Sequence, residues 1–229
     1  MASHLDLEEQ EQLDQLKHFW KKHGNWITWA LTLVLAAYAG WNFYQYWQKN
    51  EAVKAAALFD EMERAVTAQD ASKLDRVLQD IREKHAQSVY AAQAVLLAAK
   101  FHADKGEAER AKAYLTWIVE KSTDLGYQSI AKLRLASVLV DMKDYSAAEK
   151  LLDSSYPPEF TALALERLGD VHQLSARSDQ AKAAYLKAWD NLSNTPEYRR
   201  LLAVKLNALG VDVQSMGKTS PAVTPGVPS

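Results

Sequence analysis

Apolar residues follow two different patterns along the chain. From Gly24 to Gln48 no charged residue occurs, and fifteen of the nineteen residues 26–44 are apolar. From Glu51 to about Leu209 the apolar positions instead recur at steps of three and four residues, as they do on one face of an α-helix. Alternating β-branched runs, which indicate strands, are missing there. The chain is therefore predicted to be all-α, with one long apolar helix followed by many short amphipathic ones.

The apolar segment is long enough to cross a membrane as a helix. About 20 apolar residues span the roughly 30 Å hydrocarbon core of a bilayer. Five of the seven tryptophans lie between Trp20 and Trp47, near the two ends of the segment, where amphipathic rings prefer the headgroup level. A transmembrane helix in contact with the lipid bilayer is therefore predicted over residues 25–48. Lysines directly before it predict that residues 1–24, a mixed acidic and basic tail, lie in the cytoplasm.

A second interpretation of the same segment is a cleaved export signal. Ala37, Tyr38 and Ala39 have the small-x-small form that precedes a signal peptidase site. Cleavage after Ala39 would release a soluble periplasmic adaptor. Two features favour a retained anchor: acidic residues in the tail, unlike a short basic leader, and an apolar run that continues beyond Ala39.

A repeat of tetratricopeptide type is predicted over residues 49–209. A small residue stands four positions before a large apolar one in three units, 37 and 33 residues apart, close to the 34-residue tetratricopeptide repeat. The small residue lets two helices approach, and the large one fills the gap between units. The pairs are Ala111 and Leu115, Ala148 and Leu152, Ala181 and Tyr185, and a poorer copy, Leu74 and Leu78. The prediction is an α-solenoid.

Punctuation residues divide this region into short helices. Proline suits the start of a helix, and glycine suits its end. A final amphipathic helix after Pro196 is predicted to cap the array, and the Pro/Gly/Ser/Thr-rich residues 210–229 are predicted to be disordered. The expected boundaries lie near Asp70, Gln87, Gly106, Gly126, Lys143, Pro157, Ser178 and Pro196.

The first helices of the units are expected to line a concave, partner-binding groove. Its lining mixes apolar and acidic side chains and lacks the Lys/Asn/Arg set of arrays that clamp a peptide carboxylate. An extended or helical segment of another protein is therefore the expected ligand. The predicted lining residues are Phe59, Glu63, Leu96, Lys100, Leu133, Ser137, Val140, Glu166, Asp170 and Gln173.

Composition argues against chemistry at this groove. A net charge of −2 gives no reason to expect nucleic acid, and the absence of cysteine excludes disulfides and thiolate catalysis. The six histidines do not have metal-ligand spacing, and no glycine-rich phosphate loop is present. We therefore expect no enzyme: no catalytic, metal or cofactor site, and no small-molecule substrate. The alternative is an enzyme that uses Glu166, Asp170 and His172. His102 and His172 share one slot of their repeats, which favours packing.

The order of the elements carries further information. The stretches concerned are "LKHFWKKHGNW", "AGWNFYQYWQ", "LRLASVLVDMKDYSAAEKLLD", "LGDVHQLSARSDQAKAAYLKAW" and "LLAVKLNALG". In this order they resemble the YfgM family, ancillary subunits of the bacterial Sec translocon, over about residues 8–210. The resemblance implies a type II inner-membrane protein whose periplasmic domain works beside the SecYEG channel and a membrane-anchored, prolyl-isomerase-like periplasmic chaperone. The proline-rich tail departs from the family's usual short end. No site residues transfer.

Overall fold

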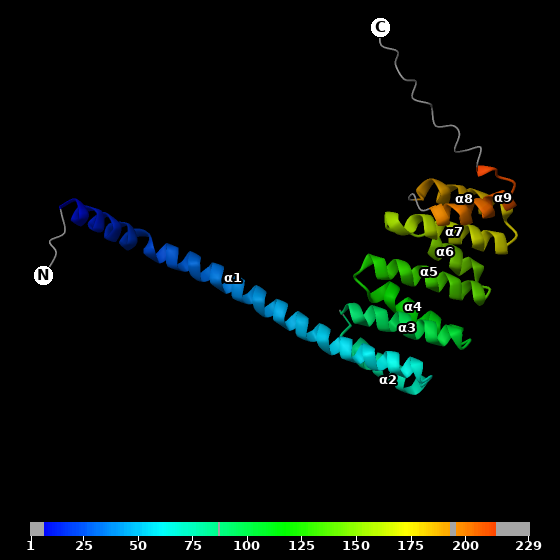
Figure 1. The fold of residues 1–229 in the computed structure, drawn as a ribbon, viewed down its shortest axis with the longest axis horizontal. Helices are drawn as coiled ribbons and strands as arrows, with labels where there is room; N and C mark the ends of the chain where they lie inside the picture. Colours follow the sequence, from blue (N-terminus) through cyan, green and yellow to red (C-terminus); the bar gives the residue numbers. More distant parts are fainter. Residues whose placement is uncertain (1–6, 87, 193–195, 214–229) are drawn as a thin grey trace, which may run out of the picture. The chain divides into compact units, whose positions relative to one another are not determined.

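The computed structural model describes residues 7–86, 88–192 and 196–213, with side chains from residue 13 onward. All regular secondary structure in these ranges is α-helical (Figure 1). The predicted all-α class is therefore confirmed. The helices are α1 (Leu7–Thr67), α2 (Ala71–Lys84), α3 (Val89–Asp104), α4 (Ala108–Lys121), α5 (Leu125–Asp141), α6 (Tyr145–Leu152), α7 (Pro158–Leu174), α8 (Ser178–Asn191) and α9 (Pro196–Ala208).

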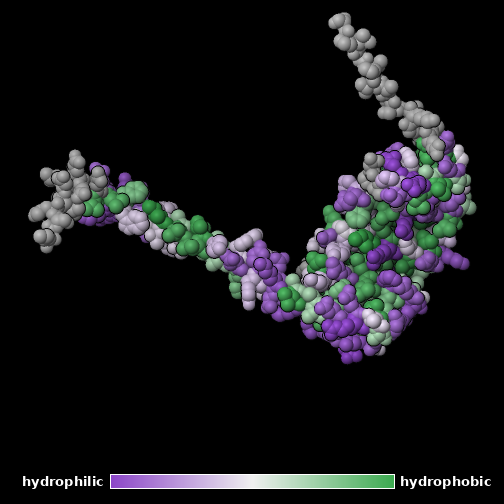
Figure 2. All heavy atoms as spheres, in the orientation of Figure 1, coloured by the Kyte–Doolittle hydropathy of each residue, from purple (hydrophilic) through white to green (hydrophobic). Residues whose placement is uncertain are grey.

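The chain divides into two compact units, one up to Lys54 and one from Ala55 onward. The first unit is the N-terminal part of α1, and a run of hydrophobic residues lies on its surface (Figure 2). Trp26, Leu33 and Phe43 are 80, 70 and 72% exposed. Within the described residues, no helix combines the length and the apolar character needed to cross a membrane, so the span predicted over residues 25–48 is not confirmed.

The second unit is a stack of short helices joined by tight turns (Figure 1). Four of these turns contain one residue in the left-handed region, with φ of 55°, 77°, 63° and 56°. These residues are Gln69, Gly106, Lys143 and Ala176. They lie 37, 37 and 33 residues apart, the same spacing as the predicted repeat pairs. The turn inside each helix pair therefore contains a residue in the left-handed conformation at the same position of the repeat.

Side-chain caps set several helix starts. Asp70, Ser88, Asp124 and Asp144 each accept a hydrogen bond from a backbone N–H three residues later, which satisfies one of the free donors of a first turn. Gly126, expected near a helix end, is instead the second residue of α5. The predicted boundary is present, since α4 ends at Lys121 and α5 begins at Leu125, but Asp124 caps the new helix and Gly126 belongs to its start.

Each predicted repeat pair is buried between helices. Ala111, Ala148 and Ala181 are fully buried, and the large residues four positions later are almost completely so. The packing predicted for the tetratricopeptide-like solenoid is therefore confirmed. Most of the buried residues form one cluster from Met62 to Ala184.

A second, smaller cluster joins α8 to the cap helix α9. It contains Ala181, Tyr185, Ala188, Leu202, Leu206 and Val213. Packed chain thus continues past the predicted end of the domain at residue 209, because Val213 is buried. The part of the predicted tail from residue 214 onward lies outside the described residues, as do residues 1–6.

Candidate functional site

The predicted groove residues lie on the end of α1 and on α3, α5 and α7, but they differ in access. Glu63, Lys100 and Gln173 are exposed, whereas Phe59, Ser137, Val140 and Asp170 are half-buried. Leu96, Leu133 and Glu166 are buried. These last three contribute to packing in the isolated chain and present little surface to a partner.

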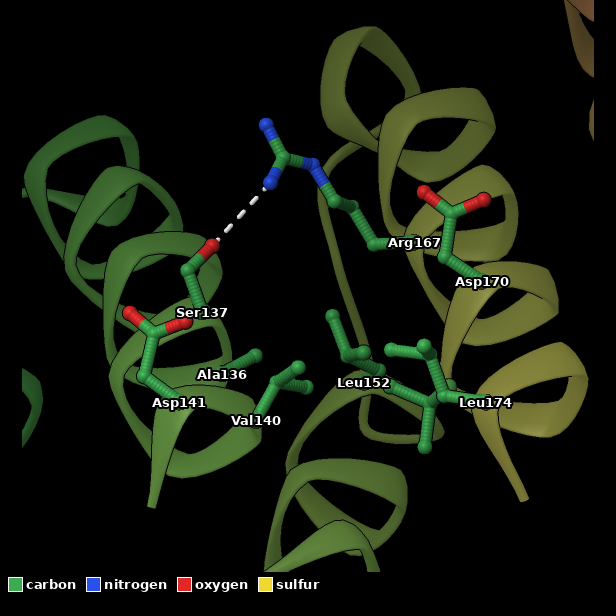
Figure 3. Close-up of a pocket in the computed structure, with 9 residues that line it drawn as sticks. Ala136, Ser137, Val140, Asp141, Leu152, Arg167, Asp170 and Leu174 are labelled. Atoms are coloured by element: carbon green, nitrogen blue, oxygen red, sulfur yellow. Dashed lines mark hydrogen bonds between the residues drawn. The ribbon is translucent and has the colours of Figure 1, made fainter. Parts of the chain in front are cut away.

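Three of the predicted residues, Ser137, Val140 and Asp170, line one cavity of about 240 Å³ between α5 and α7 (Figure 3). Sequence reasoning placed these residues on one surface but did not identify the cavity. Its other lining residues are Ala136, Asp141, Leu152, Arg167, Val171 and Leu174.

The cavity is apolar at depth and polar at its rim. Leu152 and Val171 are each 2% exposed and are among its most buried lining residues. Arg167 of α7 donates a hydrogen bond of 3.0 Å to Ser137 Oγ of α5, so the two helices are linked across the rim (Figure 3). Leu174, a lining residue, is 56% exposed. Leu174 therefore adds accessible apolar surface at the edge of the cavity, and predominantly apolar lining is typical of ligand pockets.

Glu166 and Asp170, both on α7, are engaged by the cap helix. Lys205 of α9 donates to Glu166 Oε1 and to both carboxylate oxygens of Asp170, at 2.6 and 2.8 Å. Tyr185 donates to Asp170 Oδ1 at 2.7 Å, and Tyr198 donates to Glu166 Oε2 at 3.2 Å. Burial and these carboxylates raise the pKa of both tyrosines. The cluster thus pairs a buried acid with a cation and fastens α9 to α7.

The three residues of the alternative catalytic hypothesis do not share a face of α7. Glu166 and Asp170 are four residues apart and both bind Lys205, whereas His172 is two residues from Asp170 and therefore points elsewhere. The Nδ1 atom of His172 has no hydrogen-bond partner among the described residues. Burial, with a smaller contribution from Arg177, lowers the pKa of His172. Within the same residues, no cluster of potential metal ligands occurs.

His102, in the equivalent slot of an earlier repeat, is completely buried and fully bonded. Its Nδ1 lies 2.8 Å from Glu107 Oε2, and its Nε2 lies 3.0 Å from Asp75 Oδ1. Arg110 and Tyr114 donate to the same Asp75 carboxylate at 2.6 and 2.9 Å. Burial alone would raise the pKa of Asp75, but the hydrogen bonds from Tyr114 and His102 lower it. This cluster ties α2 to α3 and α4.

Sequence reasoning missed Arg167, Asp141, Leu174 and Lys205. For Lys205 a signal exists: it stands between Leu202 and Leu206, in the otherwise apolar stripe of the last helix. A cation at such a position indicates a buried acid opposite it. For the others, a polar helix face gives no local signal.

Comparison with known proteins identifies the family. Residues 17–211 match the family described as tetratricopeptide repeat-like domain. The chain is 33% identical over 210 residues to the ancillary SecYEG translocon subunit of Neisseria gonorrhoeae, which covers 91% of this chain and all of the relative. Proteins of the same name from Haemophilus influenzae and Escherichia coli are 26 and 27% identical, each over 89% of this chain and 98 and 97% of the relative.

Among solved structures, a MamA fragment (residues 41 to the end) from Desulfovibrio magneticus RS-1 is similar at 17% identity, with a TM-score of 0.47, over 72% of this chain and 92% of the fragment. A further MamA structure is similar at the same identity with a TM-score of 0.46, over 75% of this chain and 98% of that one. The extent of the sequence matches, on a helical-repeat fold, decides the assignment. The chain belongs to the family of ancillary SecYEG translocon subunits.

Proposed function

We propose that this protein is a membrane-anchored, non-enzymatic adaptor that binds the SecYEG translocon through its repeat domain. The observation that carries the proposal is the open, apolar cavity between α5 and α7, on the face where the first helices of the repeats lie. An adaptor needs a rigid array of helices and a surface that accepts part of another protein, and α3 to α8 provide the array.

The proposed anchor is residues 25–48 of α1. Their apolar side chains are exposed, as shown by Trp26, Leu33 and Phe43, and a lipid bilayer would cover them. Tryptophan and tyrosine lower the mean hydropathy of this segment, yet their rings favour the membrane interface. Lysines before the segment support an inner-membrane, type II orientation, with residues 1–24 in the cytoplasm and residues 49–209 in the periplasm.

The proposed partners follow from the family. The relatives are named as SecYEG subunits, and an anchored domain meets a channel in the same membrane at a raised effective concentration, so a modest affinity suffices. A membrane-anchored periplasmic chaperone is proposed as a second partner, supported by the sequence resemblance. The engagement of Glu166 and Asp170 by Lys205 supports a structural role for these acids rather than a catalytic one.

Two measurements on one preparation test this proposal. Membranes that carry the full-length chain are washed with alkaline carbonate, and the intact mass of the chain is recorded from both fractions. We expect a full-length chain in the pellet, and after detergent extraction we expect SecYEG to co-purify with it. A chain that begins at Gly40 in the wash would support the cleaved, soluble alternative instead. A retained chain that does not bring SecYEG with it would contradict the adaptor role.

A further inference from the structure

We propose that the cavity between α5 and α7 receives one large apolar side chain from a segment of SecYEG that lies outside the bilayer. This inference rests on the proposed function and adds to it the docking site and the chemistry of the ligand.

The size of the cavity favours a side chain over a small molecule. Small-molecule sites usually enclose roughly 300–1,000 Å³, whereas this cavity has about 240 Å³ and is partly open to solvent. A space of this size fits a single anchor side chain of a protein segment. Interfaces gain most of their affinity from a few such anchors in well-packed pockets.

The accessible apolar surface lies where an anchor would enter. Leu174 is 56% exposed, and Val140, across the cavity on α5, is half-buried (Figure 3). Below them, Leu152 and Val171 are already shielded from water. A bound apolar side chain would remove the surface of Leu174 and Val140 from water, which is the main source of stabilisation at such a site.

Charges at the rim define what should flank the anchor. Asp170 is occupied by Lys205 and Tyr185, so it offers no charge to a ligand. Arg167 is half-exposed: one terminal nitrogen donates to Ser137, and Nε lies 3.9 Å from Glu166 Oε2. The other terminal nitrogen remains a donor for an acidic residue of the partner. On the opposite helix, Asp141 is exposed and has no ion-pair partner among the described residues, so it suits a basic residue.

The preceding repeat shows why this cavity differs from its neighbour. At the positions of Ser137 and Asp141, one repeat earlier, stand Lys100 and Asp104, which form an ion pair of 2.5 Å. In α3 the aspartate is thus neutralised within its own helix. In α5 serine replaces that lysine, so Arg167 can reach the rim and the charge of Asp141 stays available. The charge pattern therefore assigns the docking site to the α5–α7 step of the array.

The test measures the affinity of the full-length protein for purified SecYEG, both in lipid nanodiscs. Three variants alter the site: Leu174→Lys, Arg167→Glu, and Ser137→Lys, which copies the preceding repeat. We expect each to weaken binding by about tenfold or more, as loss of an interface hot spot does. Arg134→Glu is the matched control, because Arg134 is exposed and occupies the position of Arg167 one repeat earlier. It should change the affinity by less than about twofold. Unchanged helicity by circular dichroism confirms that the variants fold.

A photo-reactive residue at position 140 identifies the occupant directly. We expect an adduct with a SecYEG subunit, and none from the same residue at position 187, on the exposed side of α8. If wild-type protein binds SecYEG but the three variants bind equally well, the inference fails and the proposed function stands. The same holds if position 140 forms adducts only with another protein. If wild-type protein does not bind SecYEG at all, both fail.

Discussion

Gly169 and Tyr185 are matched in size across the α7–α8 contact. A Cβ atom on Gly169 would lie 2.3 Å from Cε1 and 2.4 Å from Cδ1 of the Tyr185 ring, far inside van der Waals contact. In the preceding repeat the same two positions hold Ala136 and Leu152. The larger side chain of Tyr185 is thus accommodated because the facing helix has glycine at position 169, which lacks the methyl group of Ala136.

Gly169→Ala should therefore lower the free energy of unfolding, although alanine favours a helix over glycine by about 1 kcal/mol. Forcing a methyl group into the ring of a buried tyrosine costs about 1–3 kcal/mol as overpacking. Urea denaturation followed by circular dichroism measures the change. The double variant Gly169→Ala with Tyr185→Leu copies Ala136 and Leu152 and should recover part of the loss. A neutral or stabilising Gly169→Ala would contradict the close fit.

The left-handed turns predict two opposite effects. Ala176→Gly should raise the free energy of unfolding by about 1 kcal/mol, because a Cβ in the left-handed region is strained and glycine removes that strain. Gly106→Ala, at the same position of another repeat, should lower it by a similar amount. Thermal melts of the two variants beside wild type provide the measurement. Shifts of the same sign would show that backbone strain does not determine the effect.

Lys205→Met should loosen the cap helix. Glu166 is 4% exposed, so loss of Lys205 leaves its nearly buried charge with a hydrogen bond from Tyr198 and an Arg167 cation that is 3.9 Å away, at a cost of about 3 kcal/mol or less. The free energy of unfolding in urea is the readout, and Lys187→Met, an exposed lysine of α8, is the matched control with little expected change. Adding Glu166→Gln to Lys205→Met should restore part of the stability. No recovery would mean that the charge is not the cause.

His172 should make the stability sensitive to mild acid. Burial, aided by Arg177, lowers its pKa in the folded state below the value of about 6.5 expected for an unfolded chain. The unfolded state therefore binds the proton more readily, so stability is complete above about pH 6.5 and falls as the pH drops through the lowered native pKa. His172→Leu, which copies Leu139 of the preceding repeat, should flatten this dependence. Melting temperatures across the acid range measure it; parallel curves would contradict the assignment.

A charge in the middle of the apolar part of α1 should weaken membrane retention. Leu33→Lys places an ammonium group where insertion carries a penalty of about 2.5–3.5 kcal/mol. We expect more of the chain in the carbonate wash, as measured by immunoblot of both fractions. Leu201→Lys on α9 is the control, since Leu201 is also an exposed leucine but belongs to the second unit. Equal retention of both variants and wild type would argue against the anchor.

Helix content and repeat register could be predicted from sequence because both are local. The pairs Ala148 with Leu152 and Ala181 with Tyr185 mark each unit through a four-residue spacing, and burial confirms them. The boundary near Gly126 is also local, but glycine favours a helix end there, whereas the cap at Asp124 makes Gly126 part of a helix start. Glycine, proline and capping residues show where a helix boundary lies more securely than they show whether a given residue belongs to the helix before it or the helix after it.

The site was predicted only in part, because its geometry depends on contacts between distant segments. Register alone placed Ser137, Val140 and Asp170 on one surface. It could not show that Asp170 is held by Lys205, a residue 35 positions away, or that Arg167 reaches across to Ser137, 30 positions away. From sequence alone, charged side chains on one helix indicate a solvent-exposed face, because the sequence does not show which helix packs against them.

The neighbour-to-neighbour packing has a consequence for how the domain is made. The principal contacts of the second unit join each helix to the next, or to the next but one. Such an array has no need for its far end in order to begin folding. If the chain emerges gradually from its N-terminal end, each helix pair can therefore fold and pack against the preceding pair before the rest of the chain has emerged. Only the last contact depends on α9: Lys205 pairs with Glu166 and Asp170 of α7 after the rest of the domain has formed.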